Sequence, residues 1–299
     1  MSSNTNSNIE VLMDYSRYWS ETQQTINTLD NHRTLRFNNR NIKKIIGFFD
    51  IKPNIKLLDS GCGTGVLIKA ISEYFHGEIY LAGIDRDVNF IRHAKTKNII
   101  NTEFIAGDAL KSPFDSNSFD IVLSYTLIEH INTMEFLKEQ YRITKSGGII
   151  GVMTCFPPSK IIKVPYFPDE ELIYDELYKV INEPEEKRSF DPFLLPEKLE
   201  QTGFTGIEID TISLPIIWDD DSLAHEQKLK IVELKAKEEL GYIELIENKL
   251  PINKFDNRIE ELKSFVKKRY ENRVIDIESG KKNWELEMNY TLCIKARKR

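Results

Sequence analysis

Short apolar runs alternate with helical patterns from Ile55 to Cys155, and this alternation constrains the fold more than any other feature of the chain. The runs IKLLD, IYLAGID, TEFIAGD and FDIVLS are separated by stretches such as VLIKAISEYF and VNFIRHAKTK, in which apolar residues recur at helical spacing. Strands that alternate with helices in this way imply crossover connections and a parallel sheet covered on both faces. The pattern therefore predicts a doubly wound α/β fold.

The segments around this alternation predict two further units. Residues 1–50 carry helical patterns in pieces and predict an N-terminal helical lid. We expect the α/β domain over residues 51–215 plus 283–299, with an irregular excursion and a short helix after Cys155. Residues 216–282 contain two charged amphipathic patterns and predict a helical insertion before the last strand. This insertion is expected to form a substrate cap or the surface of a homodimer.

The end of the chain, WELEMNYTLCIKARK, has the pattern of a strand. Leu286, Met288, Tyr290 and Leu292 occur at every second position, which is the period of a strand with one buried face. We therefore expect a single final strand that pairs antiparallel at or near the edge of the sheet.

Composition and charge exclude several classes of protein. The 299 residues include 41 basic and 47 acidic ones, and a formal charge of −6 gives no electrostatic reason to expect nucleic acid as a partner. The start MSSNTNSNIE lacks the pattern of a secretory signal. No run approaches the roughly 18 to 20 apolar residues of a membrane span, so we expect a cytoplasmic protein with no membrane partner. The three cysteines form no CxxC pair and indicate neither a disulfide framework nor a zinc site.

The stretch LLDSGCGTG, residues 57–65, forms the turn after the first predicted strand. In a doubly wound sheet ligands bind at the carboxyl ends of the strands, and the three glycines would let the backbone approach a ligand closely. A dinucleotide loop prefers the spacing GxGxxG, whereas this loop is GxGxG. Asp59 would repel a pyrophosphate but could face an ammonium group, so the sequence predicts a ligand that is cationic on this side.

Two more acidic residues stand at the ends of predicted strands. Asp85 follows Gly65 by twenty positions, where a carboxylate can accept hydrogen bonds from a ribose diol. Asp108 ends the third strand and could accept from an adenine amino group, with the backbone amide of Ala109 beside it. The pattern GxxxxGK[ST] is absent, which disfavours ATP.

These motifs resemble the class I S-adenosylmethionine-dependent methyltransferases. The resemblance covers roughly residues 55–155, through LLDSGCGTG, GIDRD, GDALKSPFDSNSFDIVLS and YRITKSGGIIGVMT in the order and approximate spacing of that family. It implies a mostly parallel, Rossmann-like sheet of seven strands, S-adenosylmethionine as cofactor and S-adenosylhomocysteine as product.

The resemblance also implies a role for each matching residue. The three loop glycines would pass the amino-acid part of the cofactor, and Asp59 would lie near its ammonium group. Asp85 would hold the ribose, Asp108 the adenine, and Ser124 would lie near the sulfonium. The expected cofactor-binding residues are Asp59, Gly61, Gly63, Gly65, Asp85, Arg86, Asp108, Ala109, Ser124 and Tyr18.

Some of these residues also have a structural interpretation. An aspartate at the end of a strand is often a helix cap, and this interpretation competes with ligand contact for Asp85 and Asp108. For Asp87 we expect the cap. Arg86 is expected either to pack against the adenine or to be solvated.

The N-terminal segment offers further groups that could reach the cofactor. Tyr15 and Tyr18 are expected either to pack in the core or to close over the bound cofactor. One of Arg33, Arg36 and Arg40 could meet the cofactor carboxylate, and the sequence does not say which.

YTLIEHI, residues 125–131, follows the fourth strand, beside the expected position of the reacting methyl group. Some small-molecule methyltransferases carry ExxEH here and bind a divalent metal, but Thr126 replaces the first glutamate, so we expect no metal. His130, together with Glu129, could act as general base, because the reference pKa of histidine lies near neutrality. The alternative is that both residues only support the local helix.

The leading functional prediction is a methyltransferase that acts on an oxygen or nitrogen atom of a small molecule by in-line displacement at the sulfonium methyl. The second hypothesis is a methyltransferase that acts on a peptide or protein side chain. The third is a non-catalytic module that binds S-adenosylmethionine, or a nicotinamide oxidoreductase that mimics the loop.

Overall fold

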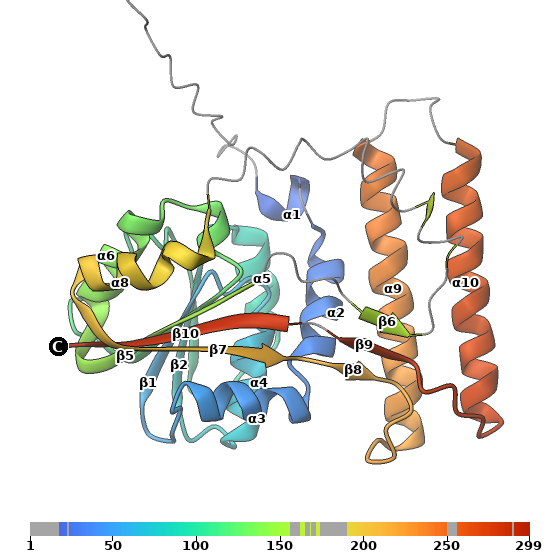
Figure 1. The fold of residues 1–299 in the computed structure, drawn as a ribbon, viewed down its shortest axis with the longest axis horizontal. Helices are drawn as coiled ribbons and strands as arrows, with labels where there is room; N and C mark the ends of the chain where they lie inside the picture. The colour runs from blue at the N-terminus through green and yellow to red at the C-terminus, as the bar shows by residue number, and fades with distance from the viewer. Residues whose placement is uncertain are drawn as a thin grey trace, which may run out of the picture.

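The structure is a computed structural model that describes residues 18–22, 24–155, 162–164, 168, 172–173, 190–249, 256–288 and 290–299. A seven-stranded sheet forms the centre of this described part (Figure 1). Its first five strands are parallel, and β10 runs antiparallel between β5 and β7. Across the sheet the strands are β3 (Thr102–Ala106), β2 (Tyr80–Asp85), β1 (Lys56–Ser60), β4 (Phe119–Tyr125), β5 (Thr144–Cys155), β10 (Tyr290–Lys298) and β7 (Phe204–Ser213). The predicted doubly wound, mostly parallel sheet is confirmed.

Helices cover both faces of this sheet (Figure 1). On β5 alternate side chains enter different cores: Ile149 and Met153 lie in one, and Ile150 and Val152 in the other. Strands buried on both faces give continuous apolar runs, which explains the pattern in the sequence. The first core packs under α3 (Asn39–Phe48), α4 (Val66–Tyr74) and α5 (Val88–Thr96), and the second under α6 (Thr133–Ile143) and α8 (Leu195–Thr202).

A second unit has its own apolar core, and most of it follows β7 in the chain. Its long helices α9 (His225–Lys249) and α10 (Asp256–Glu278) pack against each other. A small sheet accompanies them, in the order β6 (Ile162–Val164), β9 (Leu286–Met288) and β8 (Ile216–Ile217). The helical pair agrees with the expected insertion, whereas β6 and β8 were not predicted. The predicted final strand is confirmed in β10, which pairs antiparallel next to the edge of the main sheet. Its predicted extent is wrong, because Leu286–Met288 forms β9, which belongs to the small sheet.

α2 (Ile26–Arg36) lies between the carboxyl ends of the parallel strands and α9 (Figure 1). Its first turn is capped by Thr25, whose side chain accepts a hydrogen bond from the Thr28 N–H at 3.2 Å. A Cβ built on Gly241 of α9 would lie only 2.6 Å from Thr28 Oγ1. The absence of a side chain at Gly241 therefore allows α9 to approach α2 this closely.

We expect Gly241→Val to lower the free energy of unfolding by about 1–3 kcal/mol, because the added side chain must push the two helices apart. Urea denaturation followed by circular dichroism measures the change. Gly47→Ala in α3 is the matched control, since a Cβ there meets nothing within 4 Å; we expect it to be neutral or stabilising by about 0.5–1 kcal/mol. Equal stability of Gly241→Val and the unmodified protein would contradict the close helix contact.

Charged side chains also enter the interior of the second unit. Glu287 of β9 is 2% exposed. Its carboxylate lies 2.7 Å from Lys235 Nζ of α9 and 3.7 Å from Arg36 Nη2 of α2. These ion pairs join β9, α9 and α2, so α2 is anchored to the second unit through charge as well as through packing.

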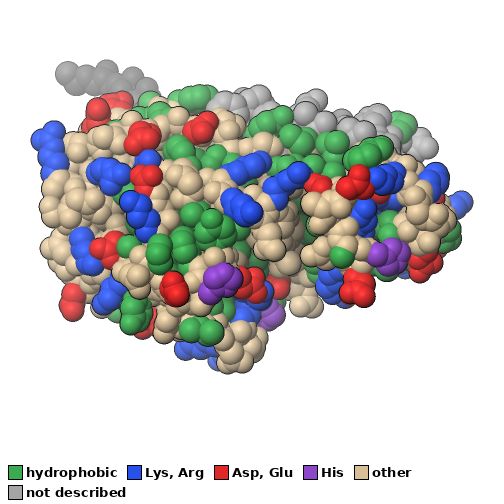
Figure 2. Space-filling model, turned by 90° about the horizontal axis from the view of Figure 1, so that it is seen from below, with side chains coloured by type: hydrophobic (Ala, Val, Ile, Leu, Met, Phe, Trp, Pro, Cys, Tyr) green, Lys and Arg blue, Asp and Glu red, His purple; other side chains and the backbone are tan. Residues whose placement is uncertain are grey.

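The surface carries charges of both signs. Figure 2 shows acidic and basic side chains interspersed with apolar ones on the face seen from below, without a broad area of one sign. Throughout the described ranges, no helix is both long and apolar enough to span a membrane.

Candidate functional site

Asp85 connects two loops at the carboxyl edge of the sheet. Its Oδ2 accepts a hydrogen bond from the Gly63 N–H at 2.8 Å, and its Oδ1 accepts one from the Asp87 N–H at 2.9 Å. Asp87 in turn caps α5 by accepting from the N–H groups of Asn89 and Phe90, so the predicted cap is confirmed. Each oxygen of Asp85 can accept a further bond, and the carboxylate therefore retains acceptor capacity for a ligand.

The loop after β1 requires glycine for two reasons. Gly61, Gly63 and Gly65 have φ values of +77°, +51° and +76°, which other residues rarely adopt. In addition, a Cβ at Gly65 would lie 2.8 Å from Phe104, and one at Gly61 would lie 3.0 Å from Leu127. Backbone conformation and packing account for much of the glycine pattern, and contact of these residues with a cofactor stays a prediction.

Three buried polar atoms at this edge have no hydrogen-bond partner among the residues that the structure describes. They are Asp59 Oδ1, Thr64 Oγ1 and Ser124 Oγ. Asp59 and Ser124 belong to the neighbouring strands β1 and β4, and Thr64 belongs to the glycine loop. Buried polar groups are normally paired, so this group indicates a polar ligand. Two hydroxyls and a carboxylate fit the ammonium-bearing end of S-adenosylmethionine.

The pKa values of the two strand-end carboxyls support this interpretation. Burial, together with the negative charge of Asp85, raises the pKa of Asp59 to about 7, although the positive charge of Arg33 acts in the opposite direction. Burial also raises the pKa of Asp85 to about 6, although two backbone N–H bonds act in the opposite direction. Both shifts disfavour the ionised form. A cationic ligand at this edge would offset that penalty.

α1 (Trp19–Thr22) bridges two segments at the carboxyl edge. The Ser20 N–H donates to Asp87 Oδ2 at 2.7 Å, at the start of α5. The Trp19 ring lies 4.7 Å from the His130 ring, centroid to centroid, at an angle of 54°. α1 therefore reaches from the loop after β2 to the segment after β4, as a lid over a ligand between them would.

The other predicted contact residues lie around the same edge. Asp108 is exposed and accepts an N–H bond from two residues further on at 2.8 Å. The carbonyl of Ala109 accepts from a side-chain amide of α6 at 2.9 Å. Arg86 is exposed, and Tyr18 is 38% exposed. Their contact with a cofactor stays a prediction, and Tyr15 lies outside the described residues.

Arg33 is the N-terminal arginine that reaches the end of β4. Its guanidinium lies 4.1 Å from the centroid of the Tyr125 ring and donates to Thr126 Oγ1 at 2.6 Å. Arg36 enters the buried ion pairs of the second unit, and Arg40 pairs with an acidic residue nearer the surface. All three stand in similar helical patterns, which is why the sequence alone did not separate them.

A short 3-10 helix, Ile128–His130, follows β4 and carries both predicted catalytic residues. The Thr154 hydroxyl, buried at the end of β5, donates to the Glu129 carboxylate. Neither Thr154 nor the Trp19–His130 contact was predicted, since a threonine in an apolar run and a tryptophan near other aromatics carry no distinct signal in the sequence. In the part of the chain that is described, no three His, Cys, Asp or Glu side chains gather to hold a metal ion.

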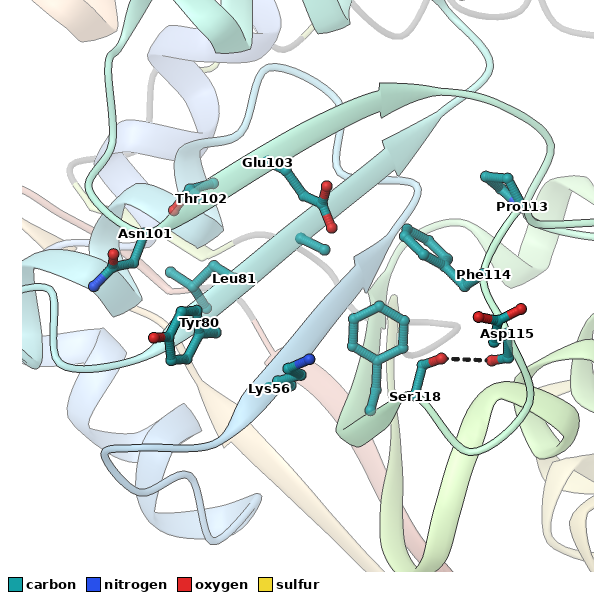
Figure 3. Close-up of a pocket in the computed structure, with 12 residues that line it drawn as sticks. Lys56, Tyr80, Leu81, Asn101, Thr102, Glu103, Pro113, Phe114, Asp115 and Ser118 are labelled. Carbon is teal, nitrogen blue, oxygen red and sulfur yellow. Dashed lines mark hydrogen bonds between the residues drawn. The ribbon is translucent and has the colours of Figure 1, made fainter.

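A cavity of about 540 Å³ opens at the other end of the strands (Figure 3). Lys56 and Tyr80, the first residues of β1 and β2, line it together with Phe114 and Phe119. Because ligands of doubly wound sheets bind at the carboxyl ends, this cavity is separate from the site formed by the glycine loop.

A doubly wound sheet with a glycine loop after β1 and carboxylates at the ends of β1 and β2 defines a nucleoside-binding α/β protein. Residues 58–152 match the methyltransferase domain family. Demethylmenaquinone methyltransferase of Staphylococcus haemolyticus is 30% identical over 182 residues, 56% of this chain and 75% of that protein. The protein of the same name from Staphylococcus carnosus is 27% identical over 184 residues, 57% and 76% of the two chains. The chain belongs to the class I S-adenosylmethionine-dependent methyltransferases.

Solved structures show the same fold. Haemonchus contortus phosphoethanolamine N-methyltransferase 2 in complex with S-adenosyl-L-methionine has a TM-score of 0.53 and 17% identity, over 94% of this chain and 59% of that one. This chain thus spans just over half of that enzyme. The YcgJ protein from Bacillus subtilis has a TM-score of 0.51 and 16% identity, over 88% and 99% of the two chains.

Proposed function

We propose that this S-adenosylmethionine-dependent methyltransferase transfers the methyl group to an oxygen or nitrogen atom of a small-molecule acceptor. The observation that supports this proposal is a set of three contacts at and directly after the end of β4. The Arg33 guanidinium lies over the Tyr125 ring, the Thr154 hydroxyl donates to Glu129, and the Trp19 ring lies against His130.

In this proposal Asp85 accepts hydrogen bonds from the cofactor ribose, and Asp59 faces the ammonium group. When bound, the cofactor supplies a methyl group on a sulfonium that is already activated toward displacement. The chain then contributes alignment of the acceptor and exclusion of water. α1 would supply the exclusion, because it bridges the two loops that flank the site.

Glu129 and His130 are the proposed acceptors of the proton that the substrate loses. The Thr154 hydroxyl fixes the orientation of the Glu129 carboxylate, and the Trp19 ring limits the position of the imidazole. Both groups follow β4, and in this proposal they face the acceptor. A positioned base of this kind contributes typically about 10²–10⁴-fold to the rate.

Calorimetric titration with S-adenosylmethionine, S-adenosylhomocysteine and NAD in parallel tests the cofactor site. We expect saturable binding of the two sulfur ligands and none of NAD. Mass spectrometry of reactions with small hydroxyl and amine acceptors, and with demethylmenaquinone, then tests the acceptor. A gain of CH₂ on a phenol or amine supports the proposal. A gain on a carbon atom, or on protein in a cell extract, would replace it.

The raised pKa values predict that S-adenosylmethionine binds more weakly as the pH falls. Without ligand, Asp59 and Asp85 take up protons near pH 7 and pH 6. The bound ligand favours their ionised forms, so affinity should fall by about tenfold or more between pH 7.5 and 5.5. The same shifts mean that these carboxyls cost folding stability in the free protein: the cost is absent only below the ordinary aspartate pKa of 3.8, grows as the pH rises, and is complete above about pH 7. Calorimetry at pH 7.5, 6.5 and 5.5 measures the affinity.

Asp59→Asn is the control for this pH dependence. It should bind the cofactor more weakly at pH 7.5, and its affinity should change less between pH 7.5 and 6.5 than that of the unmodified protein, because only Asp85 still titrates. If the affinity of the unmodified protein stays constant from pH 7.5 to 5.5, neither carboxyl is coupled to the ligand.

A further inference from the structure

Thr126 has an unusual backbone conformation at a sensitive position. Its φ is +50°, in the left-handed region that a β-branched residue rarely adopts. Thr126 directly follows β4, two residues after Ser124. Strained backbone of this kind persists only where surrounding contacts hold it, and such positions cluster at functional sites.

Two contacts hold Thr126 in this conformation. Its N–H donates to the carbonyl of Met153 in β5 at 2.8 Å, and its hydroxyl oxygen accepts from Arg33 Nη2 at 2.6 Å. The Arg33 guanidinium is itself fixed by stacking on the Tyr125 ring at 4.1 Å, and Phe37 packs edge-on against the same ring, 5.1 Å between centroids. The position of Arg33 is therefore fixed by the Tyr125 ring as well as by its hydrogen bond to Thr126.

The left-handed residue determines where the following segment goes. Directly after Thr126 the chain turns back, so that the Leu127 side chain covers the glycine loop, 3.0 Å from where a Cβ of Gly61 would lie. The 3-10 helix Ile128–His130 begins at the next residue, and the His130 N–H donates to the Leu127 carbonyl at 2.9 Å. An extended Thr126 would direct this segment away from the loop.

We propose that Arg33 is a positioning residue: by holding Thr126 in the left-handed conformation, it fixes the segment Leu127–His130 against the glycine loop. The proposal rests on the proposed function, in which Glu129 and His130 face the acceptor. It assigns to α2 a role in catalysis that is exerted through the backbone of another segment. Any contact of Arg33 with the cofactor would be additional.

Substitutions at Thr126 separate this role from a direct chemical role of its hydroxyl. Thr126→Val keeps the branched side chain and loses the acceptor for Arg33, whereas Thr126→Asn favours the left-handed region and supplies a new acceptor oxygen. We expect Thr126→Val to lower kcat at least tenfold, with the Kd for S-adenosylmethionine within about threefold of the unmodified value. Thr126→Asn should retain kcat within about threefold. Arg33→Met should lower kcat as Thr126→Val does.

Hydrogen exchange of the His130 amide provides a readout that needs no acceptor. We expect it to exchange at least tenfold faster in Thr126→Val and Arg33→Met than in the unmodified protein, and at an unchanged rate in Thr126→Asn. If no acceptor is ever turned over, this measurement still tests the positioning role. Failure of the proposed function can therefore be told apart from failure of the positioning role of Arg33.

Two results would overturn the proposal. One is a Thr126→Val variant in which both the exchange rate of the His130 amide and kcat equal those of the unmodified protein. The other is loss of kcat in Thr126→Asn together with full activity in Thr126→Ser, which would show that the hydroxyl acts directly on the substrate.

Discussion

Replacement of Asp85 by alanine is expected to weaken S-adenosylmethionine binding by about 10- to 150-fold, that is by about 1.5–3 kcal/mol, as charge-assisted hydrogen bonds are lost. Two effects contribute to this loss of binding free energy. The ribose loses its acceptor, and the N–H groups of Gly63 and Asp87 lose the carboxylate that now joins their loops. Calorimetric titration of the purified variant measures the change in Kd.

Asp120→Ala is the matched control for Asp85→Ala. Asp120 is also a strand carboxylate, and it accepts from the Lys56 N–H at 2.9 Å and from Lys145 Nζ at 2.7 Å, but it stands near the amino end of β4. Its loss should reduce stability and leave the Kd unchanged. If Asp85→Ala binds the cofactor as the unmodified protein does, Asp85 is not part of the site.

Arg273→Met is expected to reduce the free energy of unfolding by about 3–5 kcal/mol, because it leaves buried carboxylates without their cation. Arg273 of α10 is 3% exposed; it pairs with Asp219, and its Nε lies 2.9 Å from Glu285. Burial alone would raise the pKa of Asp219, yet the hydrogen bond and charge of Arg273, together with the N–H groups of Glu285 and Asn283, outweigh burial and leave this pKa below its usual value. Urea denaturation measures the loss.

Lys282→Ala tests whether burial is the reason for this large effect. Lys282 pairs with Asp221, and the two side chains are 39% and 71% exposed. An exposed pair contributes about 0–1 kcal/mol, so the variant should resemble the unmodified protein. Similar losses in Arg273→Met and Lys282→Ala would show that the interior of the second unit does not penalise an unpaired charge.

The α/β core could be predicted from the sequence because its signals are local. Each parallel strand is a continuous apolar run, and the glycine spacing in residues 57–65 predicts a ligand-binding loop. The acidic residues Asp59 and Asp85 were found from their positions at the ends of these runs. No knowledge of tertiary contacts was needed for any of these steps.

The second unit was predicted less well because its strands break the usual pattern. On β9 the buried residue is Glu287, between the half-buried Leu286 and Met288. Its charge is compatible with burial only because Lys235 and Arg36 arrive from distant parts of the chain. Alternation of apolar residues therefore suggested one long strand where the structure has two.

Some features of the candidate site could not be predicted because they depend on similar long-range contacts. Arg33 differs from its neighbours only because α2 places it over Tyr125, and Thr154 matters only because Glu129 lies beside it. A positive φ at Thr126 has no signature in the sequence either, since threonine is not a residue that favours it.

The antiparallel pairing of β7 with β10 has a consequence for how such a chain can diversify. Ser213 and Tyr290 are partners in this pairing, so everything between them is, topologically, the connection of a β-hairpin enlarged to hold two long helices. The entropic cost of closing a connection, expressed as a free energy, rises by only about 0.6 kcal/mol for each doubling of its length. One continuous stretch of coding sequence could thus be lengthened, shortened or exchanged between relatives while the strands and the glycine loop keep their register.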